Sequence, residues 1–317
     1  MINQLCNLGI NEKLIFLLVI SSFLLTIILI KICFSVMPTD QGKAFAVNGA
    51  ISKGKPRGVG IVFILCFIIM SALFLPINLE FYGYLAGVFF AMLSGYLDDR
   101  SSIPWNEYKK GLIDLILALC TTGIMYFSEV LTVIPITGNP TFDCSLAIFI
   151  SIVLIWVSIN VTNCSDGVDG LCGSVSIITL LTCFAFIHGT NAIYSTATLI
   201  MVSCILGYLW FNVSPSSILM GDAGSRAIGY FIGILCLKFL PFYVYFVVAF
   251  VLLVDGGIGI FKVVLLRFFK IHILKNIQTP LHDFVRKSKG WSDGQVVFRF
   301  SLIQLLVSFG LYFWMQS

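Results

Sequence analysis

The first long apolar run of the chain is Leu14-Ile-Phe-Leu-Leu-Val-Ile-Ser-Ser-Phe-Leu-Leu-Thr-Ile-Ile-Leu-Ile-Lys-Ile-Cys-Phe-Ser-Val36, in which Lys31 is the one charged residue. A helix that crosses a bilayer needs about 20 mostly apolar residues, so this run is long enough to span a membrane. It is too long for the core of a cleaved signal peptide, and it lacks a small-residue cleavage site. We therefore expect a retained first transmembrane helix.

The composition of the whole chain agrees with this start. Of the 317 residues, 59% are hydrophobic and 11% are charged, against about 45–50% and about 25% in a typical soluble domain. One soluble core of this size cannot hide so much apolar surface. The composition also excludes a disordered protein, a secreted disulfide scaffold and a nucleic-acid-binding module. We expect an all-α, polytopic membrane protein in which residues 1–317 form a single integral-membrane domain.

Apolar stretches long enough to span a membrane recur about ten times along the chain. Their approximate bounds are 14–36, 58–77, 81–97, 111–128, 144–161, 172–187, 192–210, 226–238, 241–265 and 296–315. The ninth stretch contains Asp255-Gly256-Gly257. An acid beside glycines in a membrane helix predicts a break or kink, which is tolerated only where protein or water satisfies the freed backbone groups.

Basic residues gather in three connections, namely those between the first and second, third and fourth, and ninth and tenth stretches. They are Lys43, Lys53, Lys55, Arg57, Arg100, Lys109, Lys110, Arg267, Lys270, Lys275, Arg286, Lys287 and Lys289. These connections lie on one side of the membrane, which the excess of Lys and Arg identifies as cytoplasmic. With ten spans, both termini then lie outside, and anionic membrane lipids favour the basic face.

Acidic residues gather on the same side, at the ends of several stretches. The clusters are Asp98 with Asp99, Asp166 with Asp169, Asp222, and Asp283. Loops on one face of a helix bundle can converge, and carboxylates of like charge that meet need a cation to hold them together. The sequence therefore predicts an active site on the cytoplasmic face.

Two of these features also have a purely structural interpretation. Asp98 and Asp99 could simply end a helix at the membrane interface, but acids at a helix C-terminus oppose the helix dipole. Asn160 and Asn163 each begin a glycosylation sequon, which cannot be used on the cytoplasmic side. We therefore favour a functional role for both features.

Two further motifs are weak by themselves. The segment Gly221-Asp222-Ala-Gly-Ser225 could be an ordinary loop, although its glycines would let a phosphate or a metal approach the backbone closely. His282 is one of three histidines, and a lone histidine is more often without a catalytic role. Together with the other acidic clusters, however, the glycine-flanked Asp222 becomes a strong signal.

The order of these clusters resembles the polyprenyl-phosphate N-acetylhexosamine-1-phosphate transferases, and among them the phospho-N-acetylmuramoyl-pentapeptide transferases, or MraY family. The matching stretches are Asp98-Asp99, Asn160 to Leu171, Trp210 to Ser225 and Pro280 to Trp291, and Gly54 to Gly60 resembles the family's glycine-rich turn. The resemblance covers the chain from about residue 40 to its end. Ten spans with both termini outside is also the topology of that family.

The resemblance implies a bacterial inner-membrane enzyme that depends on Mg²⁺. It would move phospho-N-acetylmuramoyl-pentapeptide from the UDP-linked form to undecaprenyl phosphate, giving lipid I and UMP during peptidoglycan synthesis. Two phosphorylated anions must meet in such a reaction, so a metal ion and cationic side chains must offset their repulsion. The partners implied are these two substrates, membrane lipids and, as in the resembling family, a second copy of the chain.

The resemblance also implies residue roles. Asp222 would be the Mg²⁺ ligand, and Asp98 with Asp99 would lie beside the lipid phosphate, Asp98 acting either as a base or as a nucleophile. The remaining residues implied are catalytic Lys110, with Lys109 as a close competitor, and His282. The substrate-binding residues implied are Lys53, Arg57, Asn160, Asn163, Asp166, Gly167, Val168, Asp169 and Asn212. The chain departs from the family pattern at four positions, which are Ser102, Leu219, Asp283 and Phe284.

Two alternatives remain open at this point. A relative that uses UDP-N-acetylglucosamine would carry the same phosphotransfer residues, and the changed residues after His282 keep it in consideration. A secondary transporter would place its ionisable residues near the bilayer midplane, where only Asp255 is expected in this chain. The muramoyl transferase is the leading hypothesis.

Overall fold

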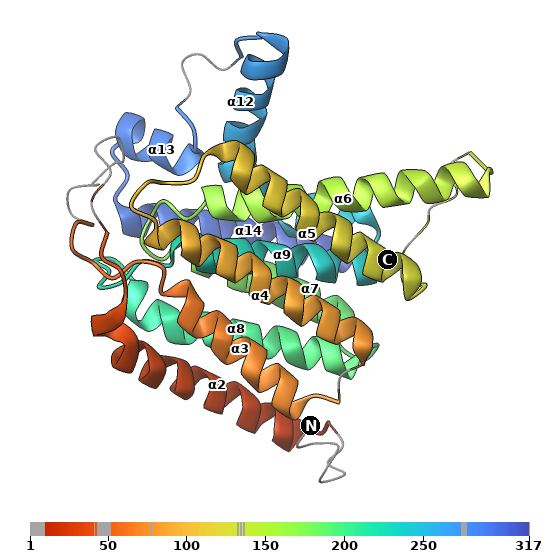
Figure 1. Ribbon diagram of the computed structural model, residues 1–317, viewed down its shortest axis with the longest axis horizontal. Helices are drawn as coiled ribbons and strands as arrows, with labels where there is room; N and C mark the ends of the chain where they lie inside the picture. Colours follow the sequence, from red (N-terminus) through yellow and green to blue (C-terminus); the bar gives the residue numbers. More distant parts are fainter. Residues whose placement is uncertain are drawn as a thin grey trace.

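The computed structural model describes residues 10–40, 42, 52–76, 78–131, 133, 135, 137–273 and 278–316. Over these residues the chain forms helices and no β-strand, apart from an isolated antiparallel bridge between Thr39 and Pro56. The helices lie side by side in a bundle, with their connections gathered at its two ends (Figure 1). Lys43 and Lys275, two of the basic residues above, lie outside the described residues.

The helices follow the predicted apolar stretches closely. The first eight are α2 (Glu12–Cys33), α3 (Gly60–Phe74), α4 (Leu79–Arg100), α5 (Glu107–Phe127), α6 (Pro140–Cys164), α7 (Leu171–Ile187), α8 (Ala192–Asn212) and α9 (Gly221–Phe239). The ninth stretch is divided into several pieces, which are η2 (Phe242–Val244), α10 (Tyr245–Val248), α11 (Phe250–Leu252), η3 (Leu253–Gly257) and α12 (Ile258–Phe269). A short helix, α13 (Leu281–Lys289), precedes the last one, α14 (Asp293–Gln316), and the short helix η1 (Phe34–Val36) extends α2.

Several of these helices can cross a membrane. By length and apolar composition five described helices qualify, namely Glu12–Val36, Glu107–Phe127, Pro140–Cys164, Ala192–Asn212 and Asp293–Gln316, and the bent pair in the ninth stretch makes up to six. The prediction of ten spans is thus met only in part, because helices such as α3 and α7 are shorter apolar helices. Over the described residues the chain is all-helical, and it is a multi-pass membrane protein.

Asparagine side chains start five of the helices. Asn11, Asn78, Asn106, Asn139 and Asn191 each accept a hydrogen bond from a backbone N–H in the first turn of α2, α4, α5, α6 and α8. The first turn of a helix leaves N–H groups without an intrahelical partner, and an asparagine N-cap satisfies one or two of them. These caps fix where the helices begin.

Helix α9 is the centre of the bundle and is buried along nearly its whole length. It packs against α3, α4, α6 and α7, and small residues allow the close approach. A Cβ on Gly87 of α4 would lie 1.8 Å from the Tyr230 hydroxyl oxygen, and one on Gly229 would lie 2.4 Å from the Ser158 carbonyl oxygen. The prediction placed this helix at 226–238, but it begins at Gly221, so Asp222 lies in its first turn.

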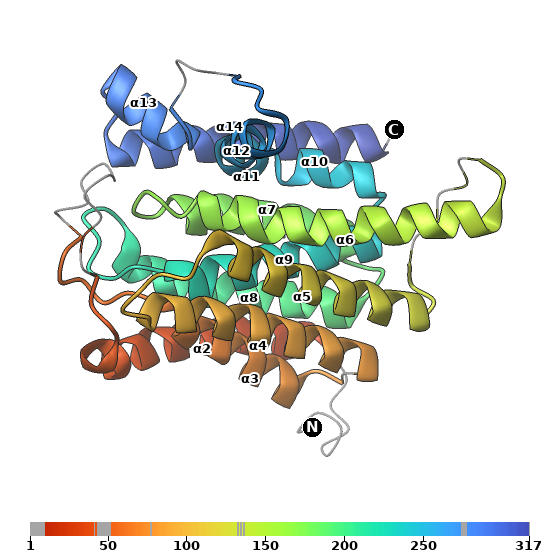
Figure 2. The same cartoon turned by 45° about the horizontal axis from the view of Figure 1, so that its top comes forward.

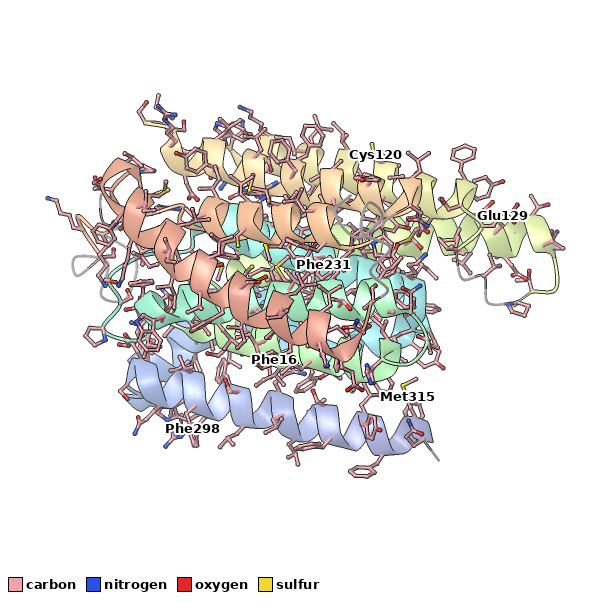
Figure 3. All side chains as sticks on the ribbon, turned by 90° about the horizontal axis from the view of Figure 1, so that it is seen from below. Phe16, Cys120, Glu129, Phe231, Phe298 and Met315 are labelled. Atoms are coloured by element: carbon pink, nitrogen blue, oxygen red, sulfur yellow. The ribbon has the colours of Figure 1, made fainter. Side chains whose placement is uncertain are left out.

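The outer surface of the bundle is apolar. Figure 3 shows Phe16 and Phe298 on the outer helices α2 and α14, and Phe231 in the interior between helices. The first two side chains are each 65% exposed, whereas Phe231 is 1% exposed. Large apolar patches of this kind are rare on soluble proteins, and they match a bundle whose outer face contacts lipid.

The ninth stretch is broken, as its glycines predict, but the sharpest bend lies before them. The helices Phe242–Val248 and Phe250–Arg267 meet at 78°, and Asp255-Gly256-Gly257 lies in a π-helical turn. Gln304 of α14 satisfies the freed backbone: its Oε1 accepts from Val251 N at 2.9 Å, and its Nε2 donates to Val248 O at 2.9 Å. Helix α12 therefore leaves the bundle at a steep angle (Figures 1 and 2).

The two ends of the bundle differ in what they hold. Helix α2 begins and α14 ends at the same end, while the α6–α7 and α8–α9 connections lie together at the other (Figures 1 and 2). That second end also receives the C-terminal turn of α4 and the first turn of α5. The acidic clusters of the sequence therefore come together at a single end.

Candidate active site

A cavity of about 530 Å³ opens at this end, between segments from most of the chain. Ten of the predicted site residues line it, which are Arg57, Lys110, Asn163, Asp166, Gly167, Val168, Asp169, Asn212, Asp222 and His282. Asp98 and Asp99 lie directly behind this lining, in contact with Lys110 and Arg57. The tertiary structure thus brings together residues that are up to 225 positions apart in the chain.

Lys110 joins two of the acidic clusters. Its Nζ lies 2.5 Å from Asp98 Oδ2 and 2.9 Å from Asp222 Oδ2. The other oxygen of Asp98 accepts a hydrogen bond from the backbone N–H of Trp105 at 2.7 Å. Lys110 precedes Gly111 in the first turn of α5, so the helix start carries the ammonium group to the ends of α4 and α9.

Arg57 also joins acidic residues, and it faces the oxygen of Asp222 that Lys110 does not contact. Its Nε donates to Asp99 Oδ1 at 2.9 Å, its Nη1 lies 3.2 Å from Asp40 Oδ1, and its Nη2 lies 3.9 Å from Asp222 Oδ1. Burial lowers the pKa of the guanidinium, but attraction to Asp99, Asp222 and Asp40 outweighs burial, so the pKa of Arg57 is raised above its ordinary value. The side chain is a permanent cation in this loop.

Close backbone packing holds this acidic group together. Asp99 Oδ2 also accepts from Ala223 N at 3.3 Å, at the start of α9, where helix N–H groups favour negative charge. Gly221 has φ +72°, and a Cβ there would lie 2.2 Å from Asp99 Oδ2. A Cβ on Gly95 would lie 2.3 Å from the Asp222 carbonyl carbon. Only glycine at both positions lets α4 and α9 meet this closely.

The α6–α7 connection forms a second wall of the cavity. Its Asp169 accepts from Ser216 N at 3.0 Å and lies 3.7 Å from Lys55 Nζ. Gly170, in a left-handed conformation with φ +82°, donates its N–H to Asn212 Oδ1 at 2.8 Å. Asn212 thus ties this wall to the end of α8, and it also donates to Ile218 O at 2.8 Å.

His282 closes the cavity from α13. Its Nδ1 lies 2.8 Å and 3.0 Å from the two carboxylate oxygens of Asp255, and its backbone N–H donates to the same group at 2.8 Å. Since a carboxylate accepts hydrogen bonds, Nδ1 donates and the ring orientation is fixed. Gly167 packs on the other ring edge, because a Cβ there would lie 2.2 Å from Nε2.

Two predicted substrate-binding residues lie elsewhere. Lys53 is exposed at the tip of a tight turn in which Gly54 has φ +88° and Lys55 N donates to Ser52 O at 3.1 Å. Lys55, not Lys53, is therefore among the residues that line the cavity. Asn160 is not part of the lining either, because its Nδ2 donates to Asp114 Oδ2 at 3.1 Å and to Trp156 O at 2.9 Å.

Sequence reasoning missed several residues of the cavity wall. They are Asp40, Lys55, Arg286 and Asp293. Asp283 also lines the cavity; it was predicted as one of the acidic clusters but was given no role at the site. Arg286 lies 3.4 Å from Asp283 and 2.9 Å from Asp293. The pairing of Asp283 with Arg286 could have been suspected from their spacing on the short helix α13, whereas Asp293 begins α14 and Asp40 carries no local signal.

The donor groups of the cavity suit an open site for a divalent cation. Within the described residues no three His, Cys, Asp or Glu side chains come together as a ready-made metal cage. Mg²⁺, however, is usually held by one or two carboxylates, with waters and substrate phosphates completing the shell. Asp222 lines the cavity with its side chain 14% exposed, so it fits this kind of site.

Comparison with known proteins agrees with this geometry. A family model described as glycosyl transferase family 4 matches residues 81–240. A phospho-N-acetylmuramoyl-pentapeptide-transferase of Treponema pallidum (strain Nichols) is 36% identical over 313 residues, covering 92% of this chain and 86% of the relative. The chain belongs to glycosyl transferase family 4. The family resemblance predicted from the motifs is confirmed.

Two other proteins named phospho-N-acetylmuramoyl-pentapeptide-transferase are less similar in sequence to this family 4 chain. The one from Dictyoglomus thermophilum is 28% identical over 279 residues, covering 86% of this chain and 90% of the relative. The one from Campylobacter curvus is 27% identical over 243 residues, covering 68% and 67%. The part matched by the family model runs from α4 to the end of α9 and so contains Asp98, Lys110 and Asp222, whereas Arg57 and His282 lie outside it.

Proposed function

We propose that this family 4 protein transfers phospho-N-acetylmuramoyl-pentapeptide from its UDP-linked form to undecaprenyl phosphate, giving lipid I and UMP in peptidoglycan synthesis. The observation that carries the proposal is the cavity at one end of an apolar bundle, where Asp222, Lys110 and Arg57 converge. A lipid phosphate reaches this depth from the membrane, and a nucleotide reaches it from water. The relatives named for this reaction support the same substrates.

The proposed step is a displacement at phosphorus. An oxygen of the lipid phosphate forms a bond to the sugar-bearing phosphorus, and the bond from that phosphorus to the bridging oxygen breaks, so UMP leaves with the electron pair. Asp98 either takes the proton of the lipid phosphate as the latter attacks, or attacks the phosphorus first and expels UMP, after which the lipid phosphate oxygen displaces Asp98 from the phosphorus. Its contact with Lys110 at 2.5 Å supports a place beside the transferred group in both routes.

Lys110 and Arg57 would supply positive charge where it is needed. Each contacts carboxylates at the cavity, Lys110 on Asp98 and Asp222, and Arg57 on Asp99 and Asp40. When phosphates enter, these cations can turn from the carboxylates to the phosphate oxygens, because charge-assisted hydrogen bonds of similar strength replace those lost. Positioned cations account for much of the catalysis of phosphoryl transfer.

We further propose Mg²⁺ as the cofactor, held by Asp222. Bound there, the ion would neutralise charge on the two phosphates and so lower the barrier to their approach. The ion would compete with Lys110 for the Asp222 carboxylate, which Lys110 contacts at 2.9 Å. The role of Lys110 is therefore to hold Asp222 in place until substrate and ion arrive together.

The α6–α7 wall would receive the nucleotide. Gly167, Val168 and Asp169 form the wall, Asn163 and Asp166 line the cavity beside it, and Lys55 carries a positive charge to the same place. His282 lines the cavity from α13 and would contact the substrate from that side, with its ring held in place through Nδ1 by Asp255. These contacts would orient the diphosphate rather than react with it.

The topology proposed is that of ten spans in one domain with both termini outside the bacterial inner membrane. It rests on the excess of Lys and Arg in the connections at the cavity end and on the placement of the α2 start and the α14 end at the opposite end (Figure 1). A homodimer remains a prediction of the family resemblance.

The decisive experiment is UMP release by the purified protein in detergent, with a panel of nucleotide sugars. We expect turnover with UDP-N-acetylmuramoyl-pentapeptide only when undecaprenyl phosphate and Mg²⁺ are both present. Turnover with UDP-N-acetylglucosamine instead would move the protein to the other branch of the family. No UMP release with any nucleotide in the panel would contradict the proposal.

A further inference from the structure

A second ion pair lies inside the bundle, next to the cavity but not in its lining. Asp114 of α5 and Arg226 of α9 are in direct contact, and each side chain is 2% exposed. Asn160 of α6 donates to the second oxygen of Asp114 at 3.1 Å. Ionisable residues within membrane helices are costly, so they point to a function and not merely to packing. The proposed reaction uses neither of these charges.

This buried pair repeats the pair at the cavity with the charges reversed. Lys110 contacts Asp222, and Asp114 contacts Arg226, so both pairs join residues 112 positions apart. Four residues along an α-helix make about one turn, or about 6 Å. The two ion pairs therefore connect α5 and α9 at successive helical turns. The Asp114–Arg226 pair lies one turn deeper in the bundle than the Lys110–Asp222 pair at the cavity.

Side chains provide the direct connection between these two helices. Helices α5 and α9 both pack closely on α4 and α6, and they reach each other through the two ion pairs and through Thr121, whose hydroxyl lies 2.5 Å from that of Tyr230. Apolar contacts are non-directional, so they allow one helix to shift along another. A guanidinium facing a carboxylate has a preferred geometry and resists such a shift.

We infer that Asp114 and Arg226 are positioning residues, which hold α5 and α9 in the register that places the Lys110 ammonium on Asp222. The inference rests on the proposed function. It predicts that the pair acts on the rate of the chemical step and not on substrate affinity, because it touches no cavity surface. A misplacement of reacting groups by about 1 Å can cost about a hundredfold in rate.

The test is the double variant Asp114→Leu/Arg226→Met, which removes both charges without leaving one unpaired. Replacing a buried ion pair with apolar side chains is often neutral for stability. We expect kcat for UMP release to fall about tenfold to about a hundredfold, with KM for the nucleotide sugar little changed and thermal unfolding in detergent close to that of the unaltered protein. Arg226→Lys keeps the charge but loses the fork geometry, so we expect a smaller loss, about threefold.

The matched control is Glu80→Leu/Lys238→Met, which removes a similarly buried ion pair at the other end of α9, with side chains 10% and 8% exposed. We expect this control to keep kcat. An unchanged kcat in the Asp114/Arg226 double variant overturns the inference, as does an equal loss of kcat in the control. If the double variant does not fold, the Arg226→Lys variant takes its place, and an unchanged kcat in that variant overturns the inference. Absence of UMP release by the unaltered protein would instead contradict the proposed function.

Discussion

The two ends of α9 hold charged side chains in opposite ways. At the cavity end, four carboxylates share two cations, since Asp40, Asp98, Asp99 and Asp222 surround Lys110 and Arg57. The carboxylates of this network therefore outnumber its cations.

At the other end of α9 one acid meets one base. Glu80 pairs with Lys238, and the rings of Tyr194 and Phe239 cover the ammonium group at 5.0 Å and 5.7 Å. An excess of like charge beside a cavity indicates a site for a cation and phosphates, whereas the balanced Glu80–Lys238 pair, far from the cavity, indicates a structural anchor.

The largest expected effect is at the cavity end. Asp222→Asn keeps the shape of the side chain but removes the charge that would hold Mg²⁺, so we expect kcat to fall by about a thousandfold. Thermal unfolding in detergent should stay close to that of the unaltered protein, because the amide oxygen of the variant can still accept a hydrogen bond from Lys110. UMP release measures the first quantity, and full activity in this variant would remove Asp222 as the metal ligand.

The opposite end should respond in stability and not in rate. Lys238→Met leaves Glu80 buried without its partner, and breaking a buried ion pair in this way costs about 3 kcal/mol. We expect a lower unfolding midpoint by circular dichroism, with kcat per folded molecule unchanged. A large loss of kcat in the folded fraction would show that the Glu80–Lys238 end of α9 is coupled to the cavity end, and it would contradict the structural role assigned to this pair.

A smaller effect is expected from a single methyl group in the cavity wall. In Gly167→Ala the new Cβ would lie 2.2 Å from His282 Nε2, so the ring must move away from its place beside Asp255. We expect kcat to fall about tenfold. The matched control is Gly123→Ala in α5, where a Cβ meets nothing within 4 Å; it should keep kcat and gain a little stability, because alanine favours a helix over glycine.

The smallest effect separates two lysines in one turn. Lys55 lies 3.7 Å from Asp169 and donates to Ser216 at 3.0 Å, whereas Lys53 is exposed. We expect Lys55→Ala to raise KM for the nucleotide sugar about fivefold and Lys53→Ala to leave it unchanged. Initial rates over a range of nucleotide concentrations measure both values, and the reverse order would restore Lys53 as the binding residue.

Most of the helices could be predicted from the sequence, because long apolar runs have one stable solution in a membrane. The errors lie where polar residues belong to a helix. Helix α9 begins at Gly221, five residues before the predicted start, because Asp222 and its neighbours are satisfied by α4 and α5 and not by water. The bend lies at Ala249 and not at the predicted glycines for a similar reason. Gln304, which is 53 residues further along the chain than Val251, satisfies the backbone at the bend.

The sequence predicted which residues belong to the candidate site better than it predicted which of them contact each other. Motif order brought Asp98, Lys110 and Asp222 to attention, and the structure places all three within one network. The choice between Lys53 and Lys55 depended on a turn whose geometry is set by Gly54. The pairing of Asp114 with Arg226 has no local signal at all, because its partners are 112 residues apart.

The amino-acid sequence by itself determined that this chain is a multi-helix membrane protein with acidic motifs gathered on one side, because hydropathy and charge act locally and are independent of the partners a helix finds. Only the tertiary structure decided which carboxylate meets which cation and which residues face the cavity. Those contacts depend on the register between helices that are distant in the chain, and glycines and buried polar side chains set that register over distances of a few ångströms.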